Sequence, residues 1–202
     1  MKLAEFVRFS LLDIINTIGK DGAEKILSSF SSPKNPDTEN YLKNEAVRDA
    51  MRGITQTHLV FSVKNNIKRF AGYFTIMSKT IFIESEKLSI NTKKHIYNLA
   101  VYDNDRKCYK TPAILIAQLS KNFTDNADKI MSGDMLLEIA FEVINDIKML
   151  TGIKVAYLEC YNTQQLKSLY SRNGFILYDK RPTDEEEYVG SSNKMLQMLR
   201  IM

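Results

Sequence analysis

The residues whose side chains could act as nucleophiles or metal ligands are few and widely spaced in this sequence. Cys108 and Cys160 are the two cysteines, and His58 and His95 are the two histidines. A zinc site needs several ligands at close spacing, and a cysteine nucleophile needs a histidine beside it. Neither pattern is present, so we expect no metal centre, and we expect Cys160 to be a small core residue. Two distant cysteines also form no disulfide framework, which fits a reducing compartment.

Carboxylate and phenol side chains are the other candidates for chemistry. Glu159 lies on an expected strand, where a carboxylate either acts as a general base or faces solvent. Tyr170 lies on an expected helix, where a tyrosine most often packs against the core. A phenol has a pKa of about 10, so at neutral pH it is protonated and could act as a general acid. The acidic run 184–187 is typical of a solvated loop.

Length and composition indicate the kind of protein that must position these residues. The chain has 202 residues, 44% of them hydrophobic, with 28 basic and 24 acidic residues and a net charge of +4. This is enough to bury the core of one domain, and it excludes a disordered chain. The small, dispersed positive charge permits an acidic ligand without requiring one. Charged residues interrupt the apolar start of the chain, so we expect no signal peptide or membrane span and a cytoplasmic protein.

The first half of the sequence reads as helices followed by an antiparallel pair of strands. The expected elements are helices over 3–18, about 23–30 and from Asn35 to Gly53, strands over 57–63 and 69–77, and an excursion from the sheet over 79–111 with a short helix near 93–99. Gly19 is expected to end the first helix. Asn35 is expected to be an N-cap, because Pro36 follows it at the first helical position.

The second half alternates strands and helices. The expected elements are strands over 113–119 and 154–160 with a helix from Gly133 to about Leu150 between them, a helix over 163–172, and strands over 175–179 and 194–201. A strand, a helix and a strand at this spacing form a parallel βαβ unit. The sequence therefore predicts an α/β protein with a mixed, mostly antiparallel central sheet that contains one parallel βαβ unit.

This order of elements, together with four short segments, resembles the GNAT N-acetyltransferase superfamily. The segments are 118–122, 132–137, 159–162 and 169–175. The last one, Leu-Tyr-Ser-Arg-Asn-Gly-Phe, is similar to the family's hydrophobic-Tyr-x-x-x-Gly-Phe segment. Phe30-Ser31-Ser32 followed by Tyr41-Leu42 is similar to the amino-terminal region of bacterial GNAT toxins, which acetylate the amino group of aminoacyl-tRNA. The resemblance implies the acyl-CoA N-acyltransferase fold over residues 30–202, with the parallel unit at the splayed centre of the sheet and a helical extension over 1–29.

The resemblance implies acetyl-CoA as cosubstrate, with its pyrophosphate at the start of the central helix. The family has a Gln/Arg-x-x-Gly-x-Gly/Ala loop there, whereas residues 128–133 are Asp-Lys-Ile-Met-Ser-Gly, which keeps the last glycine alone. Backbone N–H groups at a helix N-terminus bind phosphate. The residues that would supply them are Met131, Ser132, Gly133 and Asp134. Lys129 adds a positive charge, whereas the carboxylate of Asp134 repels phosphate. One glycine before a helix is also a common cap.

The pantetheine arm of the cosubstrate pairs with a strand in this family. By resemblance, the main-chain groups of Leu119, Ser120 and Lys121 would make this pairing, although the same residues also read as a buried strand that runs into a loop. Asn162 would reach the pantetheine or the phosphates. With Gln165 three residues later, Asn162 also reads as the start of a capping box.

The resemblance finally assigns the reaction. An amine would attack the thioester directly, Tyr170 would protonate the leaving CoA thiolate as the general acid, and Glu159 is the best candidate for the general base. The acceptor stays open between aminoacyl-tRNA and a small amine. The alternative is a weakly active or inactive GNAT-fold binding module, favoured by the altered phosphate loop. A tRNA partner and a homodimer are left open, and neither a metal nor a membrane is expected.

Overall fold

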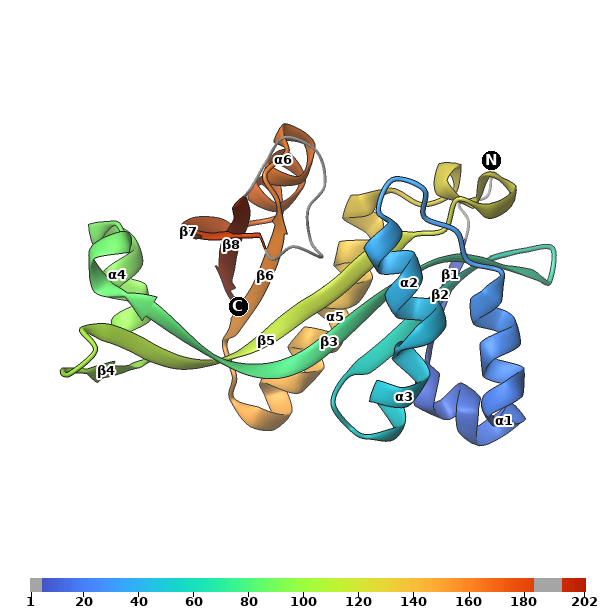
Figure 1. Ribbon diagram of the computed structural model, residues 1–202, viewed down its shortest axis with the longest axis horizontal. Coiled ribbons are helices and arrows are strands. Elements are labelled where there is room, and N and C mark those ends of the chain that lie inside the picture. The colour runs from blue at the N-terminus through green and yellow to red at the C-terminus, as the bar shows by residue number, and fades with distance from the viewer. Residues whose placement is uncertain (1–4, 184–193) are drawn as a thin grey trace. The chain divides into compact units, whose positions relative to one another are not determined.

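The structure is a computed structural model that describes residues 5–183 and 194–202 (Figure 1). The acidic run 184–187 and the first residues of the helix expected over 3–18 lie outside the described residues. Within the described part of the chain, eight strands are hydrogen-bonded in the order β1-β2-β3-β5-β6-β8-β7, with β4 beside β5. The described residues form two compact units, one within residues 1–77 and 117–141 and the other within residues 78–116 and 142–202.

The first unit contains the amino-terminal helices and the antiparallel strands. Its elements are β1 (Glu5–Ser10), α1 (Leu11–Ser28), α2 (Pro36–Asn44), α3 (Ala46–Met51), β2 (Gln56–Lys64), the start of β3 (Ile67–Glu84), the end of β5 (Cys108–Lys121), a 3-10 turn (Thr124–Lys129) and the start of α5 (Gly133–Thr151). Asn65 and Asn66 both have positive φ, of 51° and 62°. They form the two-residue turn of the β2–β3 hairpin, as expected for a primed turn.

The helix expected over residues 3–18 is wrong for its first part. Residues 5–10 form β1, which pairs antiparallel with β2 from Glu5 opposite Val63 to Ser10 opposite His58. The helix begins at Leu11, where the Ser10 hydroxyl accepts a hydrogen bond from the Asp13 N–H at 3.1 Å. A short apolar run fits both the helical repeat and the strand repeat. Residues 5–10 form a strand because they pair with β2, which is distant in the sequence.

The expected breaks in the helical region are confirmed in part. Gly19 has non-helical angles, with φ of 78° and ψ of 170°, inside α1. Asn35 is the N-cap residue of α2 and Pro36 its first residue, although the Asn35 side chain makes no capping hydrogen bond. The single helix expected from Asn35 to Gly53 is instead two helices that meet at Glu45.

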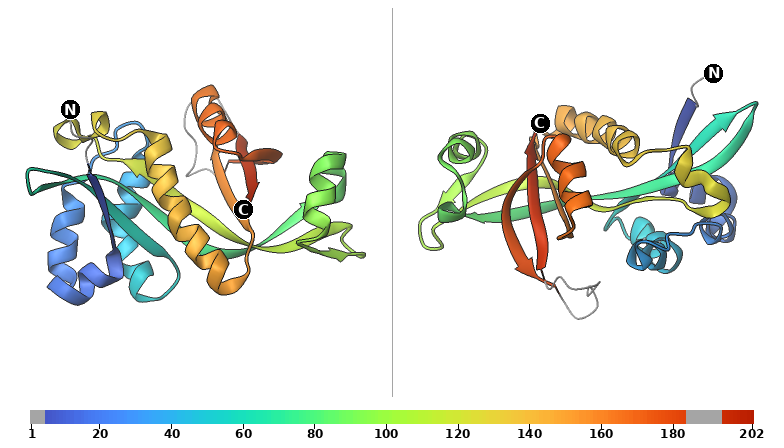
Figure 2. Two further views of the ribbon diagram at one scale, coloured as in Figure 1. Left: turned by 180° about the vertical axis from the view of Figure 1, so that it is seen from behind. Right: turned by 90° about the horizontal axis from the view of Figure 1, so that it is seen from above.

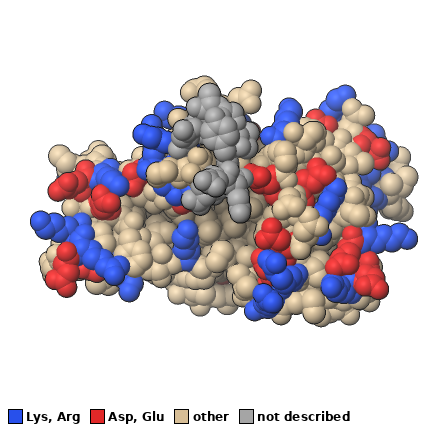
Figure 3. All heavy atoms as spheres, viewed as in Figure 1, with Lys and Arg blue, Asp and Glu red and all other residues tan. Residues whose placement is uncertain are grey.

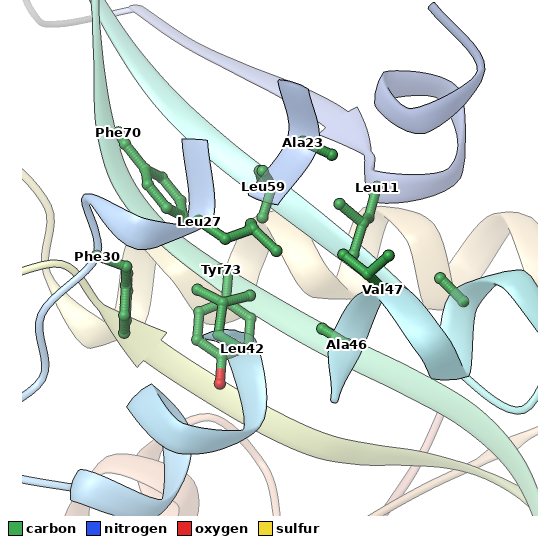
Figure 4. Close-up of a cluster of buried hydrophobic side chains, with 11 residues drawn as sticks. Leu11, Ala23, Leu27, Phe30, Leu42, Ala46, Val47, Leu59, Phe70 and Tyr73 are labelled. Atoms are coloured by element: carbon green, nitrogen blue, oxygen red, sulfur yellow. The ribbon is translucent and has the colours of Figure 1, made fainter. Parts of the chain in front are cut away.

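The core of the first unit lies between α1–α3 and one face of β2 and β3 (Figure 4). Its buried side chains include Leu11, Ala23, Leu27, Phe30, Leu42, Ala46, Val47, Leu59, Phe70 and Tyr73. The buried Tyr73 hydroxyl donates to the Thr38 carbonyl at 2.6 Å, which satisfies the polar end of that side chain. The first turns of α5 pack on the opposite face, where a Cβ at Gly72 would lie 3.3 Å from Leu136 Cδ2.

The second unit contains the parallel pair. Its elements are the end of β3, a 3-10 turn (Ser85–Lys87), α4 (Ile90–Tyr97), β4 (Val101–Asp103), the start of β5, the end of α5, β6 (Val155–Tyr161), α6 (Gln164–Arg172), β7 (Ile176–Pro182) and β8 (Lys194–Ile201) (Figure 2). β5 and β6 are parallel, with Ile114 opposite Ala156 and Leu115 opposite Tyr157, which confirms the expected βαβ unit. β8 is antiparallel to both β6 and β7.

The excursion expected over 79–111 is shorter than the sequence suggested. β3 continues to Glu84 and β5 begins at Cys108, so part of this stretch stays in the sheet. Ile81 and Ile83 are buried while Phe82 between them is 48% exposed, which is the alternation of a strand. The short helix spans Ile90–Tyr97 rather than 93–99.

The mixed, mostly antiparallel α/β sheet predicted from the sequence is therefore confirmed. Positive and negative side chains are interspersed on the face shown in Figure 3, in keeping with the dispersed charge. Across residues 5–183 and 194–202, no helix is long and apolar enough to cross a membrane.

Candidate functional site

The end of β5 lies unusually close to β3 in the first unit. A Cβ at Gly72 would lie 2.8 Å from the Ser120 carbonyl oxygen and 3.2 Å from the Lys121 Cα. Such contacts are too short for any residue with a side chain, so β3 carries glycine where β5 approaches it. The buried Ser120 hydroxyl lies 3.0 Å from the Ser32 hydroxyl. The side chain of Ser120 is thus bonded to the loop before α2, and the role predicted for the main chain of Leu119–Lys121 stays a prediction.

Asn122 directly follows β5 and fixes the loop after it. This buried side chain donates from Nδ2 to the Phe70 carbonyl at 3.0 Å. Its Oδ1 accepts from the N–H groups of Ser31 at 3.0 Å and Thr124 at 3.1 Å. The anchoring role of Asn122 was not predicted from the sequence. The available signal was a polar amide at the end of an apolar strand, which is a common place for a side chain that bonds the backbone.

The loop between β5 and α5 has a defined conformation. Asp125 and Asn126 have positive φ of 52° and 58°, a region that Asp and Asn tolerate better than most residues. The Lys121 Nζ donates to the Asp128 carbonyl at 2.9 Å and holds the two ends of the turn together. Lys129, expected to add positive charge at a phosphate site, is exposed.

α5 begins at Gly133, as the sequence predicted. The Ser132 hydroxyl accepts from the Met135 N–H at 3.1 Å and caps the helix. The N–H groups of Gly133 and Asp134 stand in the first turn, where no intrahelical acceptor exists for them. The Met131 side chain is 1% exposed, so the position that holds a glycine in the family's motif here contributes to the core. The first unit therefore holds the expected phosphate-loop residues and Leu119–Lys121 together.

The remaining predicted residues belong to the second unit. Tyr170 lies on α6 and is buried, with its ring edge-on to Phe175 at a centroid distance of 5.8 Å. Burial, reinforced by the neighbouring Cys160, raises the pKa of Tyr170 above its ordinary value. The phenol therefore keeps its proton at neutral pH. A protonated phenol is the state that a general acid needs.

Glu159 is held by three donors. Its Oε2 accepts from Arg181 Nε at 2.5 Å, and its Oε1 accepts from Gln197 Nε2 at 2.9 Å and from the Tyr157 hydroxyl. Burial acts to raise the pKa of Glu159, but these hydrogen bonds and the charge of Arg181 outweigh it, so the pKa is lowered. Glu159 is therefore a carboxylate at neutral pH and a weak base.

Asn162 does not cap α6, so that part of the prediction is wrong. The N-cap is Thr163, whose hydroxyl accepts from the Leu166 N–H at 3.3 Å. The reason is a tight turn one residue earlier, in which the Thr163 N–H donates to the Tyr161 carbonyl at 2.7 Å around Asn162. Asn162 is exposed, and its predicted contact with the cosubstrate stays a prediction.

Neither cysteine has the surroundings of a nucleophile. Cys108 and Cys160 are free thiols and both are buried. Burial raises the pKa of Cys160 to about 12, so little reactive thiolate exists at neutral pH. This confirms that Cys160 is a core residue. In the part of the chain that the structure describes, no group of three or more His, Cys, Asp or Glu residues is arranged to hold a metal ion.

Comparisons with known proteins identify the fold. No protein-family profile and no curated protein matches the sequence. Solved structures do match. AtaT complexed with acetyl-methionyl-tRNAfMet is 16% identical, with a TM-score of 0.62 over 95% of this chain and 94% of that chain. A tyrosine-to-phenylalanine mutant of KacT is 18% identical, with a TM-score of 0.60 and the same coverage.

The chain has the GNAT fold. A third GNAT-fold structure, AtaTR bound with acetyl-CoA, is 14% identical with a TM-score of 0.55, over 95% of this chain and 92% of that chain. The likeness to these toxins extends over nearly the full length of both chains in each comparison. The resemblance first drawn from short sequence segments is therefore confirmed at the level of the GNAT fold.

Proposed function

We propose that this protein is an acetyl-CoA-dependent N-acetyltransferase. The observation that carries the proposal is the GNAT fold over 95% of the chain, shared with a structure described as bound with acetyl-CoA. The N-terminus of α5 supports it, because Gly133 and Asp134 place main-chain N–H groups where a helix dipole favours a phosphate. The end of β5, kept in place by Gly72 and Asn122, would pair with the pantetheine arm.

The proposed reaction is direct transfer of the acetyl group to a primary amine. The amine nitrogen attacks the thioester carbonyl, a C–N bond forms, and the C–S bond breaks to release the CoA thiolate. The nitrogen loses one proton and the thiolate gains one, so no further reactant is needed. Tyr170, which holds its proton in the buried site on α6, would deliver a proton to the sulfur.

Glu159 stays our candidate for the general base, in a limited role. Its lowered pKa and its bond to Arg181 make it a weak proton acceptor. An acceptor amine of low pKa, such as that of an aminoacyl ester, needs little help from a base. We therefore propose aminoacyl-tRNA as the acceptor, in line with the complex of AtaT with acetyl-methionyl-tRNAfMet. A homodimer and a cytoplasmic location stay predictions.

Release of free CoA thiol tests the proposed activity. With acetyl-CoA and an aminoacyl-tRNA such as Met-tRNA, or a panel of small amines, we expect thiol release and an acetylated product. Tyr170→Phe should lower turnover about 100-fold, because general acid catalysis contributes on that order. Its affinity for acetyl-CoA should stay the same. The matched control is Tyr97→Phe, which removes the hydroxyl from an exposed tyrosine of α4. Equal turnover in Tyr170→Phe and wild type would remove the general acid role.

If this protein acts as a toxin, its induction alone should arrest growth, and induction of the Tyr170→Phe variant should not.

A binding module with the same fold is the second candidate function. The buried Met131 favours it because it replaces a glycine of the family's phosphate loop, and the carboxylate of Asp134 favours it because it repels phosphate. A module of this kind would release no thiol with any acceptor, and its melting temperature would not rise with millimolar acetyl-CoA.

A further inference from the structure

Two lysines from separate segments of the first unit converge on one aromatic ring. The Lys34 Nζ lies 5.3 Å from the centroid of the Phe123 ring, and the Lys121 Nζ lies 5.8 Å from it. Lys34 belongs to the loop before α2, whereas Lys121 is the last residue of β5. Both distances fall within the range of cation–π contacts.

The main chain holds these two segments together. The Phe123 N–H donates to the Ser31 carbonyl at 2.8 Å, and the Thr124 hydroxyl donates to the Ser29 carbonyl at 2.7 Å. The Ser31 N–H returns a hydrogen bond to the Asn122 side chain at 3.0 Å. Because these bonds involve the backbone of both loops, the convergence of the lysines is a property of the fold.

The ring attracts each ammonium group only weakly where the site is open to water. Neither Lys34 nor Lys121 is in an ion pair with a carboxylate in residues 5–183 or 194–202. One donor of Lys121 is used by the Asp128 carbonyl. A lysine has three donors, so both ammonium groups can bind a further acceptor. Two lysines that lie beside the same ring and pair with no carboxylate of the described residues are suited to an anion.

We propose that Lys34 and Lys121 bind phosphate groups of acetyl-CoA. The inference rests on the proposed function. Lys121 ends the strand expected to pair with the pantetheine arm, and it is bonded to the loop that leads to the start of α5. That loop carries the carboxylate of Asp128, and the first turn of α5 carries the carboxylate of Asp134. The two lysines would offset the repulsion of phosphate by these carboxylates. The ammonium group of a lysine suits this task as a compact point charge.

The test compares two thioesters that share the acetyl-pantetheine arm. Acetyl-CoA carries the phosphates, whereas S-acetylpantetheine carries none. Calorimetry should show that Lys34→Gln raises the Kd for acetyl-CoA about tenfold at low salt, with a smaller change at high salt because exposed charges are screened. The Kd for S-acetylpantetheine should not change. Lys34→Arg keeps the charge and should bind like wild type.

Lys25→Gln is the matched control. It removes the same charge from an exposed lysine of α1 and should leave both Kd values unchanged. The Lys34 side chain is itself exposed, so Lys34→Gln should fold like wild type. The Lys34→Gln/Lys121→Gln pair should lose more affinity for acetyl-CoA than either single change.

The outcomes separate this inference from the proposed function. If Lys34→Gln binds acetyl-CoA as wild type does, the lysine site is wrong and the acetyltransferase proposal stands. If the change raises the KM of the acceptor RNA and leaves the Kd for acetyl-CoA unchanged, the lysines hold the acceptor and our assignment is overturned. If the wild-type protein neither binds acetyl-CoA nor releases thiol from it, both proposals fail.

Discussion

Replacing Gly72 with alanine tests the close approach of β3 and the end of β5. The added Cβ would lie 2.8 Å from the Ser120 carbonyl oxygen, which is closer than real Cβ atoms come to a backbone atom. The Leu136 side chain, at 3.3 Å, limits movement on the other side. The backbone of Ser120 and Lys121 must therefore shift, and these residues belong to the segment that we expect to pair with the pantetheine arm.

The cost of this change follows from two opposing effects. Inserting a methyl group into a packed interior costs about 1–3 kcal/mol. Gly72 does not have positive φ, so alanine can adopt its backbone angles and gains about 0.4–1 kcal/mol through the lower entropy of the unfolded chain. The net loss of unfolding free energy is about 1–2 kcal/mol. For a protein of this size, the melting temperature should fall by roughly 2–8 °C.

The assay is thermal unfolding together with the Kd for acetyl-CoA, and Gly53→Ala is the matched control. Gly53 has a φ of +70° and no atom within 4 Å of an added Cβ, so alanine there strains the turn locally without moving β5. Both variants should lose stability, but only Gly72→Ala should raise the Kd. A Gly72→Ala protein as stable as wild type, with the same Kd, would refute the close approach and the argument built on it.

Two further predictions concern buried polar side chains of the first unit. Asn122→Ala leaves the buried Phe70 carbonyl and Ser31 N–H without partners, so denaturant unfolding should show a loss of about 2–4 kcal/mol, and a loss below 1 kcal/mol would contradict the anchoring role. Burial and then the charge of Arg8 lower the pKa of His58 to about 4, so the unfolded chain takes up this proton first as the pH falls. Neutral His58 therefore contributes to the free energy of unfolding above about pH 6.5, and this contribution, on the order of 3 kcal/mol at most, is lost as the pH falls towards 4. In His58→Gln, the free energy of unfolding measured with denaturant should change less between pH 6.5 and pH 4 than it does in wild type.

Residues whose local pattern agrees with the fold could be assigned from the sequence. The start of α5 at Gly133 and the parallel unit around it followed from regular apolar spacing. The strand at residues 5–10 could not be assigned, because its apolar spacing also fits a helix and its pairing partner is β2. The continuation of β3 to Glu84 was missed because exposed polar and aromatic residues alternate with Ile81 and Ile83 there.

The candidate site was predicted less completely than the fold. The sequence placed Tyr170 on a helix and Gly133 at a helix start, and both positions agree with the structure. The cap at Asn162 was wrong by one residue, since a tight turn gives that position to Thr163. The roles of Asn122 and Gly72 depend on contacts between segments far apart in the chain, which no local pattern contains.

The loop after β5 is held by its own bonds before any ligand arrives. Asn122 fixes its start, the Lys121 ammonium ties it to the Asp128 carbonyl, and Ser132 caps the helix at its end. Ordering a flexible loop on binding lowers affinity, and a loop ordered in advance avoids that loss of entropy. A ligand that binds beside this loop would meet a rigid receptor. Its association should therefore be a single kinetic phase, with a rate proportional to ligand concentration and no slower rearrangement after it.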